Sequence, residues 1–430
     1  PVFYCADCGK PIVTDETIQL ISDLFAAEGS NAWFAKQAEE ILPAGFTCPH
    51  CGKAAGFTKE EDTLDGWFDS GSTHLASMKK DQGFWPADVY MEGLDQYRGW
   101  FQAALLTAVG STGVAQAPFK TCITHGWTVD GEGKAMHKSL GNGVDPYEIM
   151  NKYGADLIRL WAASADYHAD MRCSEKIFKQ LSQNYLKFRN TARYCLGNLN
   201  GFDPNHLVAP AEMLELDRWA ITRLNALIVK CFQGYDDYDF NVVTHAVNDF
   251  CVVEMSNFYL DILKDRLYCE GKDSLPRRSA QTALYFILDT MTKIMAPVLC
   301  FTGDEIWQSM THPEGVDGRN VVFNDMNQPF TAYALEAETM AKWEKIIQVR
   351  DVVNGALESA RSSKKIGKSL EARITLTVTE EEKFLADLEP QELADLLIVS
   401  QVEVVAGEAL AAEVAEAAGE KCQRCWKVLP

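Results

Sequence analysis

The spacing of apolar residues changes along the chain and divides it into regions with different predicted structure. From residue 175 to about residue 330, apolar side chains recur every three or four positions, which is typical of amphipathic helices in a bundle. Further helical stretches begin near residues 216, 248 and 281, and the last ends at Pro297. The first stripe comprises Ile177, Leu181, Tyr185 and Phe188. The pattern predicts an all-α domain over residues 175–330.

Residues 331–405 mix helical and alternating patterns. A helix is predicted from about Leu335 to Ser362, strands at 373–378 and 402–405, and an acidic helix at 391–398. This region therefore predicts a small α+β domain. Alanine and glutamate dominate residues 406–420, so the remainder, residues 406–430, is expected to be an acidic linker followed by a cysteine pair.

Before residue 175, short apolar strands run into loops rich in glycine and polar residues. Strands are predicted at 88–91 and 122–129, and residues 14–40 suit one or two amphipathic helices. In a doubly wound α/β sheet, groups at the carboxyl end of a strand face the ligand crevice. We expect an insert over residues 1–55 and half of an α/β domain over residues 56–174.

Composition sets broad limits on the class of protein. The chain has 430 residues, enough for two or three domains, and a formal net charge of −21. Residues 380–420 hold twelve acidic residues and one basic residue, so about half of that charge is local and a basic groove elsewhere is compatible with it. There is no signal peptide and no membrane-length apolar run, which predicts a cytoplasmic protein. Because the chain begins at Pro1 and ends just after a cysteine pair, we expect a piece of a longer protein.

Thirteen cysteines include three Cys-x-x-Cys pairs. Two of these pairs, each followed by Gly-Lys, are separated by 39 residues and suit one tetrahedral four-cysteine zinc site, although two unrelated thiol pairs remain the alternative. Four thiolates leave no open coordination position, so the role of zinc would be structural, and His50 would not be a ligand. The predicted ligands are Cys5, Cys8, Cys48 and Cys51. The third pair, Cys422 and Cys425, is half of such a site.

A glycine-flanked basic loop at residues 131–142, Gly-Glu-Gly-Lys-Ala-Met-His-Lys-Ser-Leu-Gly-Asn, follows the second predicted strand. A lysine and a serine on such a loop can reach phosphate oxygens, the lysine through its charge and the serine through its hydroxyl. The loop resembles the "KMSKS" loop of class I aminoacyl-tRNA synthetases. Aligned on Met136, Lys138 and Ser139 match that pattern, whereas Ala135 and His137 depart from it. Lys134 lies one place early and is a candidate for the missing charge.

Three further motifs narrow the resemblance. The strings WFDSG (67–71), EGLDQYRGWF (92–101) and HGWTVDGEG (125–133), followed by KSLGN, resemble in order and spacing the second half of the catalytic domain of isoleucyl-tRNA synthetases. The resemblance implies an aliphatic pocket walled by Trp67 and Trp100. It implies adenylate contacts from Glu92, Gly93, Asp95 and Gln96. It places His125, Gly126, Met136 and Lys138 by the nucleotide, with Lys138 and Ser139 as the catalytic pair. For Asp95 alone, capping of the next helix is the simpler alternative.

The same resemblance implies the fold and the reaction. The fold would be a Rossmann-like class I catalytic half with a zinc-knuckle insert, then a helical anticodon-binding bundle, then the α+β region. The reaction would be activation of L-isoleucine by ATP with Mg²⁺, followed by transfer to tRNA(Ile), in an enzyme that is monomeric at full length. In the family, the "HIGH" motif and the editing domain lie upstream, and neither is found here. A valyl-tRNA synthetase relative and a non-catalytic tRNA- and zinc-binding module are the alternatives.

For several basic residues, the sequence is compatible with two roles, RNA contact and a simpler structural or solvated one. Lys176, Lys179 and Lys187 lie on the side of the first bundle helix away from Ile177 and face either RNA phosphates or water. Arg159 suits a structural ion pair or an RNA contact. The most basic short run contains Lys364, Lys365 and Lys368, for which a solvated loop is the alternative.

Overall fold

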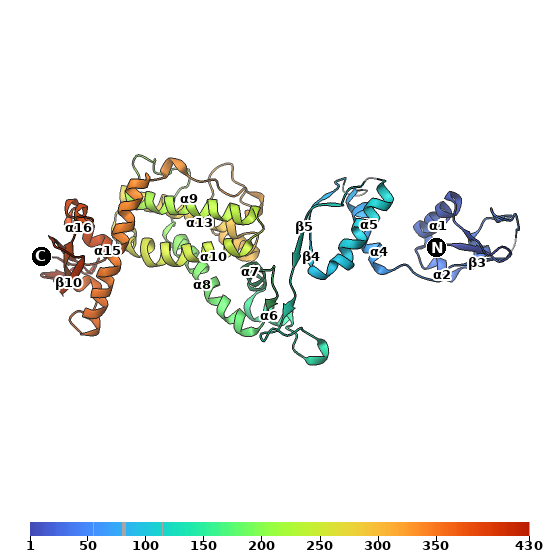
Figure 1. Cartoon of the computed structure of the whole chain (residues 1–430). Coiled ribbons are helices and arrows are strands. Elements are labelled where there is room, and N and C mark those ends of the chain that lie inside the picture. The colour runs from blue at the N-terminus through green and yellow to red at the C-terminus, as the bar shows by residue number, and fades with distance from the viewer. Residues whose placement is uncertain (55, 80–82, 114, 430) are drawn as a thin grey trace. The chain divides into compact units, whose positions relative to one another are not determined.

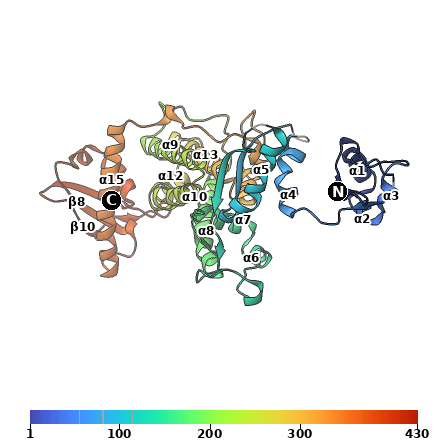
Figure 2. The ribbon, with the colours of Figure 1, turned by 45° about the vertical axis from the view of Figure 1, so that its right-hand side comes forward.

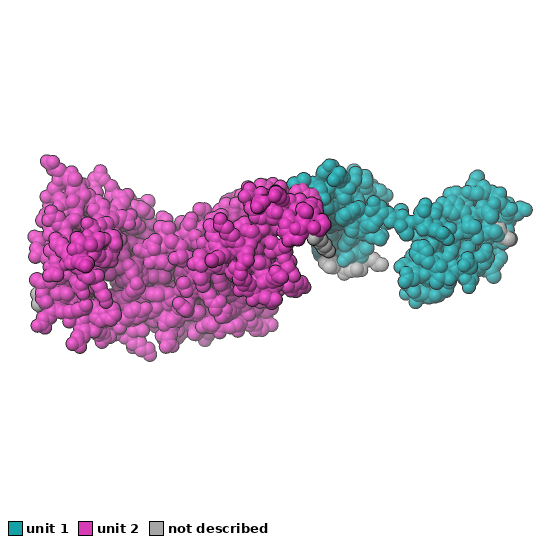
Figure 3. Space-filling model, turned by 90° about the horizontal axis from the view of Figure 1, so that it is seen from below, with its two compact units in different colours: residues 1–124 teal, residues 125–430 magenta. Residues whose placement is uncertain are grey.

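The computed structural model describes residues 1–54, 56–79, 83–113 and 115–429, apart from the side chains of Thr112 and Lys138. The chain divides into two compact units, Pro1–Thr124 and His125–Pro430, which Figure 3 colours separately. Among the described residues, none of the helices combines the length and the apolar character needed to cross a membrane.

The first 60 residues form a small module with its own core. Strand β1 (Phe3–Cys5) pairs antiparallel with both β2 (Pro11–Ile12) and β3 (Phe57–Lys59). Three helices lie between β2 and β3, one more than the upper number predicted: α1 (Asp15–Glu28), α2 (Ala32–Ala35) and α3 (Ala38–Ile41). The Thr14 hydroxyl begins α1 by accepting from the amide of Thr17. Trp33 packs edge-on against Phe3, with ring centroids 5.0 Å apart.

The rest of the first unit is built around one long helix and two paired strands. Strand β4 (Ala87–Gly93) pairs with β5 (Phe119–His125), and α5 (Trp100–Thr112) lies between them in the sequence. The other elements are α4 (Gly66–Gly71), a π-helical turn (His74–Lys79) and a 3-10 turn (Leu94–Arg98). Gly71 is required where α4 crosses α5, because a Cβ there would lie 2.7 Å from the backbone carbon of Ala103.

The second unit opens with the loop-bearing segment. Strand β6 (Thr128–Val129) pairs in parallel with β7 (Met171–Arg172), so the base of the loop is tied to the residues that precede the bundle. Between them lie a 3-10 turn (Lys138–Leu140), α6 (Pro146–Tyr153) and α7 (Ala155–Ser164).

The predicted helical bundle is present and forms the largest core of the chain. Helix α13 (Leu275–Met295) is buried at every position from Ser279 to Met295, and α9 runs beside it, with α10 packed against α9 (Figure 1). The other elements are α8 (Glu175–Asn198), α9 (Glu215–Asp236), α10 (Phe240–Asp249), a π-helical segment (Phe250–Tyr259), α11 (Leu260–Ile262), α12 (Lys264–Cys269) and α14 (Cys300–Gln308). Of the stripe predicted on α8, Phe188 is buried, whereas Ile177, Leu181 and Tyr185 are only half-buried.

After the bundle, a long helix leads into a three-stranded sheet. Helix α15 (Ala337–Ser362) packs against strand β10 (Ala411–Glu416) (Figure 2) and also against α16 (Pro390–Leu397). Strand β8 (Ala372–Val378) is central and pairs in parallel with β9 (Gln401–Ala406). The remaining elements are 3-10 turns at Val321–Phe323, Thr331–Tyr333, Ser369–Glu371 and Lys383–Asp387, and the short pair β11 (Glu420–Lys421) and β12 (Val428–Leu429).

The expectation that residues 406–420 form a linker is wrong for its central part. Residues 411–416 form β10, which pairs antiparallel with β8 from Ala411 opposite Thr377 to Glu416 opposite Ala372. Only Val414 of this strand is buried, so the Ala/Glu sequence carries almost no alternating signal. Backbone pairing along the edge of an already formed sheet holds it instead.

Helix α7 is fastened to the bundle by two oppositely charged side chains. Buried Asp156 accepts hydrogen bonds from the amide of Thr302 at 2.7 Å and from the Thr302 hydroxyl at 2.6 Å, at the start of α14. Arg159 donates to the carbonyls of Pro297 and Val298 at 2.7 and 2.9 Å. The expected ion pair is therefore absent: Arg159 forms no salt bridge within the described chain and instead binds backbone oxygens just after α13. Its alternative role, an RNA contact, stays a prediction.

A second buried carboxylate, on α9, joins that helix to three other helical segments of the bundle. Asp217 is fully buried and accepts from the Tyr259 hydroxyl at 2.7 Å, from both terminal nitrogens of Arg266 at 2.8 and 3.1 Å, and from the Ser279 hydroxyl at 2.5 Å. These donors come from the π-helical segment, α12 and α13, so one side chain fixes their positions relative to α9.

We predict that Asp217→Asn lowers the free energy of unfolding of the second unit by roughly 3–5 kcal/mol, because it leaves a buried arginine without its counter-charge. Denaturant titration followed by helical circular dichroism measures this. Asp236→Asn, at an exposed position on the same helix, is the matched control and should change little. Equal stability of the two variants would contradict the assignment of Asp217 as a structural centre.

Candidate active site and metal centre

Four cysteine thiols meet in the first module. The Sγ atoms of Cys5, Cys8, Cys48 and Cys51 all lie within 4.8 Å of one another, with Cys5–Cys51 at 3.7 Å and Cys8–Cys48 at 3.8 Å. A tetrahedral ion with bonds of about 2.3 Å to sulfur sets its ligands about 3.8 Å apart. The group therefore fits a metal ion of that kind. His50 stands outside it, with its Nε2 3.0 Å from the carbonyl oxygen of Pro11.

Both halves of this group are presented by the same backbone turn. In each half, the amide of the first cysteine donates to the carbonyl of the lysine five residues later. The amide of the glycine just before that lysine donates to the carbonyl of the first cysteine. Gly9 and Gly52 have φ of +68° and +76°, in the left-handed region that favours glycine. Burial works to raise the pKa of the Cys48 thiol, but the amides of His50 and Cys51 outweigh it and lower the pKa to about 7.

The third cysteine pair adopts the same turn without a glycine. The amide of Cys422 donates to the carbonyl of Lys427 at 2.8 Å, and the amide of Trp426, whose φ is +65°, donates to Cys422 at 3.0 Å. Buried Lys427 reaches Asp265 at 2.8 Å and Asp395 at 2.5 Å, which docks the turn on α12 and α16. Within the described chain no third ligand joins Cys422 and Cys425.

The two tryptophans of the predicted aliphatic pocket lie on neighbouring helices. Trp67 is in the first turn of α4, whose start is capped by Asp65, and the residue is 47% exposed. Trp100 begins α5, stacks on Tyr90 with ring centroids 4.4 Å apart, and donates its indole N–H to the carbonyl of Ser70 at 3.0 Å. Trp100 therefore holds α4 against α5, while Trp67 leaves much of its ring open to a ligand.

The predicted adenylate-binding residues follow strand β4. Glu92 is exposed and Gly93 buried, and Asp95 and Gln96 are half-buried on the 3-10 turn. One oxygen of Glu92 accepts the amide of Gly93 at 3.0 Å. The side-chain oxygen of Gln96 accepts the amide of Trp100 at 2.7 Å, so Gln96, and not Asp95, caps α5.

The phosphate-loop residues lie in the second unit. The His125 ring bonds the carbonyl of Gly126, and a Cβ on Gly126 would lie 2.4 Å from the carbonyl oxygen of Ala169, which explains the glycine. Met136 packs on the core of the unit, and Ser139 is exposed on the 3-10 turn. The side chain of Lys138 lies outside the described part of the structure. Lys134 pairs with Glu132 at 2.9 Å, with both side chains largely exposed.

Two residues that sequence reasoning missed hold this loop in shape. Asp130 accepts from the amides of Glu132 and Lys134 at 3.0 and 2.9 Å. The Asn142 amide group donates to Asp130 and to the carbonyl of Ala135, and its oxygen accepts the amide of His137 at 3.0 Å. Bonding to the Lys134 amide, then to Asn142, lowers the pKa of the Asp130 carboxyl. The Asp-Gly-Glu-Gly sequence, a turn signal, was the clue available for Asp130.

Two family models match the chain. One, described as class I tRNA synthetases of the isoleucyl, leucyl, methionyl and valyl type, matches residues 1–174, and one described as the anticodon-binding domain of tRNA ligases matches residues 217–376. The curated isoleucine–tRNA ligase of Caldicellulosiruptor saccharolyticus is 48% identical over 99% of this chain, and that of Caldanaerobacter subterraneus subsp. tengcongensis likewise. The chain belongs to the class I aminoacyl-tRNA synthetases. Within them it groups with isoleucine–tRNA ligases.

The chain spans 46% and 47% of the length of these two relatives. Among solved structures, it is similar to a leucyl-tRNA synthetase from Agrobacterium radiobacter K84, in complex with tRNA and LeuAMS. That match has a TM-score of 0.55 and 16% identity, and covers 96% of this chain and 49% of the other. It confirms the synthetase fold. In the first unit, β4 and β5 form only a two-stranded sheet among the described residues, so the Rossmann-like assignment comes from the family match.

For this synthetase chain, we predict that Asn142→Ala loosens the loop. The amide of His137 loses its acceptor, and its hydrogen exchange should accelerate by about fivefold, the equivalent of one hydrogen bond of ~1 kcal/mol. Asn151→Ala, an exposed position on α6, serves as the control. Unchanged exchange at His137 would show that Asn142 does not hold the loop.

Proposed function

We propose that this chain is the loop-bearing catalytic half and the tRNA-binding part of an isoleucyl-tRNA synthetase, which activates L-isoleucine with MgATP and transfers it to tRNA(Ile). The observation that carries the proposal is the 48% identity to isoleucine–tRNA ligases along 99% of the chain. The basic loop at 131–142, braced by Asp130 and Asn142, supports it independently.

The reaction has two displacement steps. The isoleucine carboxylate attacks the α-phosphate of ATP and releases pyrophosphate, and a terminal ribose hydroxyl of the tRNA then takes the isoleucyl group from the adenylate. Both steps need positioning and charge stabilisation more than covalent participation by the protein. We assign the stabilisation of phosphate charge to Lys138, with Ser139 as a hydrogen-bond donor.

The amino-acid and adenylate contacts belong to the first unit in this proposal. Trp67 on α4 offers a half-exposed apolar ring and Trp100 on the neighbouring helix α5 a fixed one, which together suit an aliphatic side chain. Glu92, Gly93, Asp95 and Gln96 would bind the adenylate, and the side-chain nitrogen of Gln96 is available because its oxygen caps α5. Such a pocket separates isoleucine from valine by one methylene, worth about 1–3 kcal/mol.

We propose zinc as the ion held by Cys5, Cys8, Cys48 and Cys51. The sulfur separations of 3.7 and 3.8 Å support a tetrahedral site, and four thiolates give a closed, structural one. For Cys422 and Cys425, we propose that the preformed turn binds zinc once further ligands are supplied, because two thiolates alone hold it poorly.

The catalytic assignment predicts that Lys138→Ala lowers isoleucine-dependent ATP–pyrophosphate exchange by about 10²–10³-fold, the usual effect of removing one charge-stabilising group. The enzyme tested joins this chain to the segment that the family places upstream. The KM for isoleucine should stay unchanged, because the proposal assigns Lys138 to the phosphates and the amino-acid contacts to residues of the first unit. Lys134→Ala should have a much smaller effect, because the charge of Lys134 is already paired with Glu132 on the same loop. A Lys138 variant with normal exchange would refute the assignment.

The metal assignment predicts one tightly bound zinc per chain by mass spectrometry of metals. Cys48→Ser should lose most of this zinc and lower the midpoint of thermal unfolding of the first unit, because folding and metal binding are coupled. Cys122→Ser, an exposed thiol outside the group, should retain the zinc. Purified wild-type chain that binds no zinc when supplied with it would overturn the proposal.

A further inference from the structure

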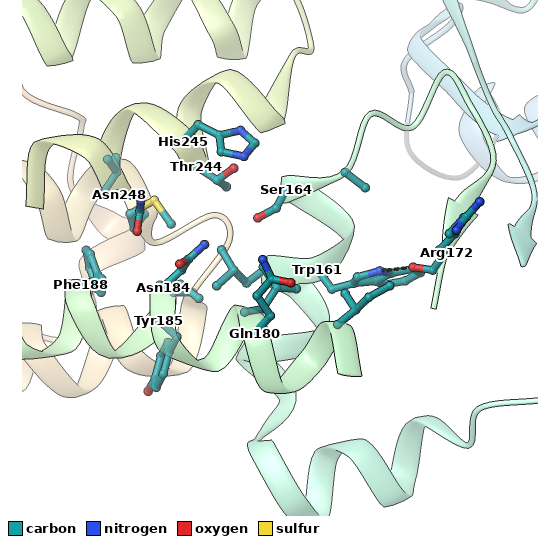
Figure 4. Close-up of a pocket in the computed structure, with 17 residues that line it drawn as sticks. Trp161, Ser164, Arg172, Gln180, Asn184, Tyr185, Phe188, Thr244, His245 and Asn248 are labelled. Carbon is teal, nitrogen blue, oxygen red and sulfur yellow. Dashed lines mark hydrogen bonds between the residues drawn. The ribbon is translucent and has the colours of Figure 1, made fainter. Parts of the chain in front are cut away.

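A cavity of about 300 Å³ lies in the second unit between α7, α8 and α10. Figure 4 shows side chains from these three helices around one space, with Ser164 on α7, Gln180 and Asn184 on α8, and Thr244 and Asn248 on α10. Its floor is apolar and is formed in part by Leu160, Leu299 and Met295. None of these residues has a role in the reaction proposed above.

The cavity presents hydrogen-bonding groups that the protein leaves unused. Within the described chain, Ser164, Gln180 and Asn184 make no side-chain hydrogen bond, and the buried Oδ1 of Asn248 has no donor. His245 uses its Nδ1 toward the carbonyl of Asn241, so its Nε2 remains. Buried polar atoms are normally paired, so the arrangement of Asn248 indicates a ligand that supplies a donor.

The other surfaces of the cavity suit a flat, partly apolar ligand. Trp161 borders it with a ring fixed by the bond from its indole N–H to the carbonyl of Arg172 at 2.9 Å. The lining contains no carboxylate and only one permanent charge, that of Arg172, so neither a cation nor a free polyphosphate is favoured. An aromatic face, amide side chains and low charge are the features that recognise an unstacked nucleobase.

The exposed flank of α8 carries a row of lysines beside the cavity. Each lysine of the row comes one position before a residue that lines the cavity, so it lies about 100° around the helix from that residue. The three are Lys176, Lys179 and Lys187. All three side chains belong to exposed residues and make no salt bridge with the described chain. The row extends for about 16 Å. A nucleic-acid backbone lying on these lysines would have the cavity within reach of a base.

We propose that this cavity holds one unstacked base of a bound RNA whose phosphates lie on Lys176, Lys179 and Lys187. The inference rests on the proposed function, which makes tRNA the partner. It adds a specific contact: Gln180, Asn184 and Asn248 read the edge of the base, while Trp161 and the apolar floor take its face.

The test is equilibrium binding of a fluorescent, unmodified tRNA(Ile) transcript to the full chain at several salt concentrations. Asn184→Trp fills the cavity from an exposed helical position, and the double variant Gln180→Ala/Asn184→Ala removes the amides without adding bulk. Each should weaken binding at least about fivefold, with the salt dependence unchanged, because stacking and base contacts release no counterions. Lys187→Ala should instead reduce the slope of log K against log salt by about one.

The matched control is Asn354→Trp, an exposed asparagine on α15, which should bind as wild type does. If the wild-type chain binds tRNA and both cavity variants bind equally well, the cavity proposal is overturned and the proposed function stands. If the wild-type chain binds no tRNA at any salt concentration, the tRNA partner itself is refuted, and the cavity proposal falls with it.

Free nucleosides test whether the cavity binds a small nucleobase-containing ligand instead of a base of RNA. Adenosine, guanosine, cytidine and uridine are titrated singly at millimolar concentration into wild type and Asn184→Trp. Saturable binding of one nucleoside to wild type alone, with tRNA affinity equal in the two proteins, would assign the cavity to a free ligand and overturn the RNA proposal.

Discussion

Asp156 is the interaction on which the arrangement of the second unit depends. Its buried carboxylate accepts a hydrogen bond from a backbone amide in the first turn of α14. Arg159, one turn later on α7, donates to the backbone carbonyls just after α13. A negative charge at a helix start and a positive charge near a helix end both match the helix dipoles. Strand β7, paired with β6, fastens the base of the loop to the segment that enters α8. The loop-bearing segment and the bundle consequently belong to one compact unit, so the tRNA that we propose for the bundle would have a fixed relation to the loop.

The loop at 131–142 and the cysteine turns are held in shape by the same kind of interaction, hydrogen bonds from backbone amides. A functional side chain on an exposed turn is useful only if the backbone beneath it is fixed, and here backbone amides do most of that work. Side-chain oxygens of Asp130 and Asn142 accept hydrogen bonds from amides of the loop. Each of the three cysteine turns has the same two backbone hydrogen bonds. Trp426 takes the left-handed conformation that glycine takes in the other two turns. Its turn is held from outside by Lys427, between two carboxylates.

Sequence reasoning succeeded where the signal is local. The bundle helices, α15, β8, α16, β9 and the four-cysteine group follow from periodicity and spacing. It failed where the partner is distant in sequence or where a strand carries almost no alternating pattern of apolar residues. Arg159 binds carbonyls nearly 140 residues away, Asp217 collects donors from three other segments, and β10 has one buried side chain. The cavity beside α8 could not be predicted from the sequence either, because its polar residues come from three different helices. The amino-acid pocket and the adenylate contacts remain predictions carried by the family resemblance.

The proposed synthetase activity is tested most directly by isoleucine-dependent ATP–pyrophosphate exchange, with this chain and the family's upstream segment supplied as separate pieces. If each piece holds half of the nucleotide site, as we propose, exchange appears only when both are present, with isoleucine preferred over valine. Absence of exchange from a mixture in which both pieces are folded and the four-cysteine group is loaded would contradict it, and would leave a tRNA- and metal-binding module as the better description.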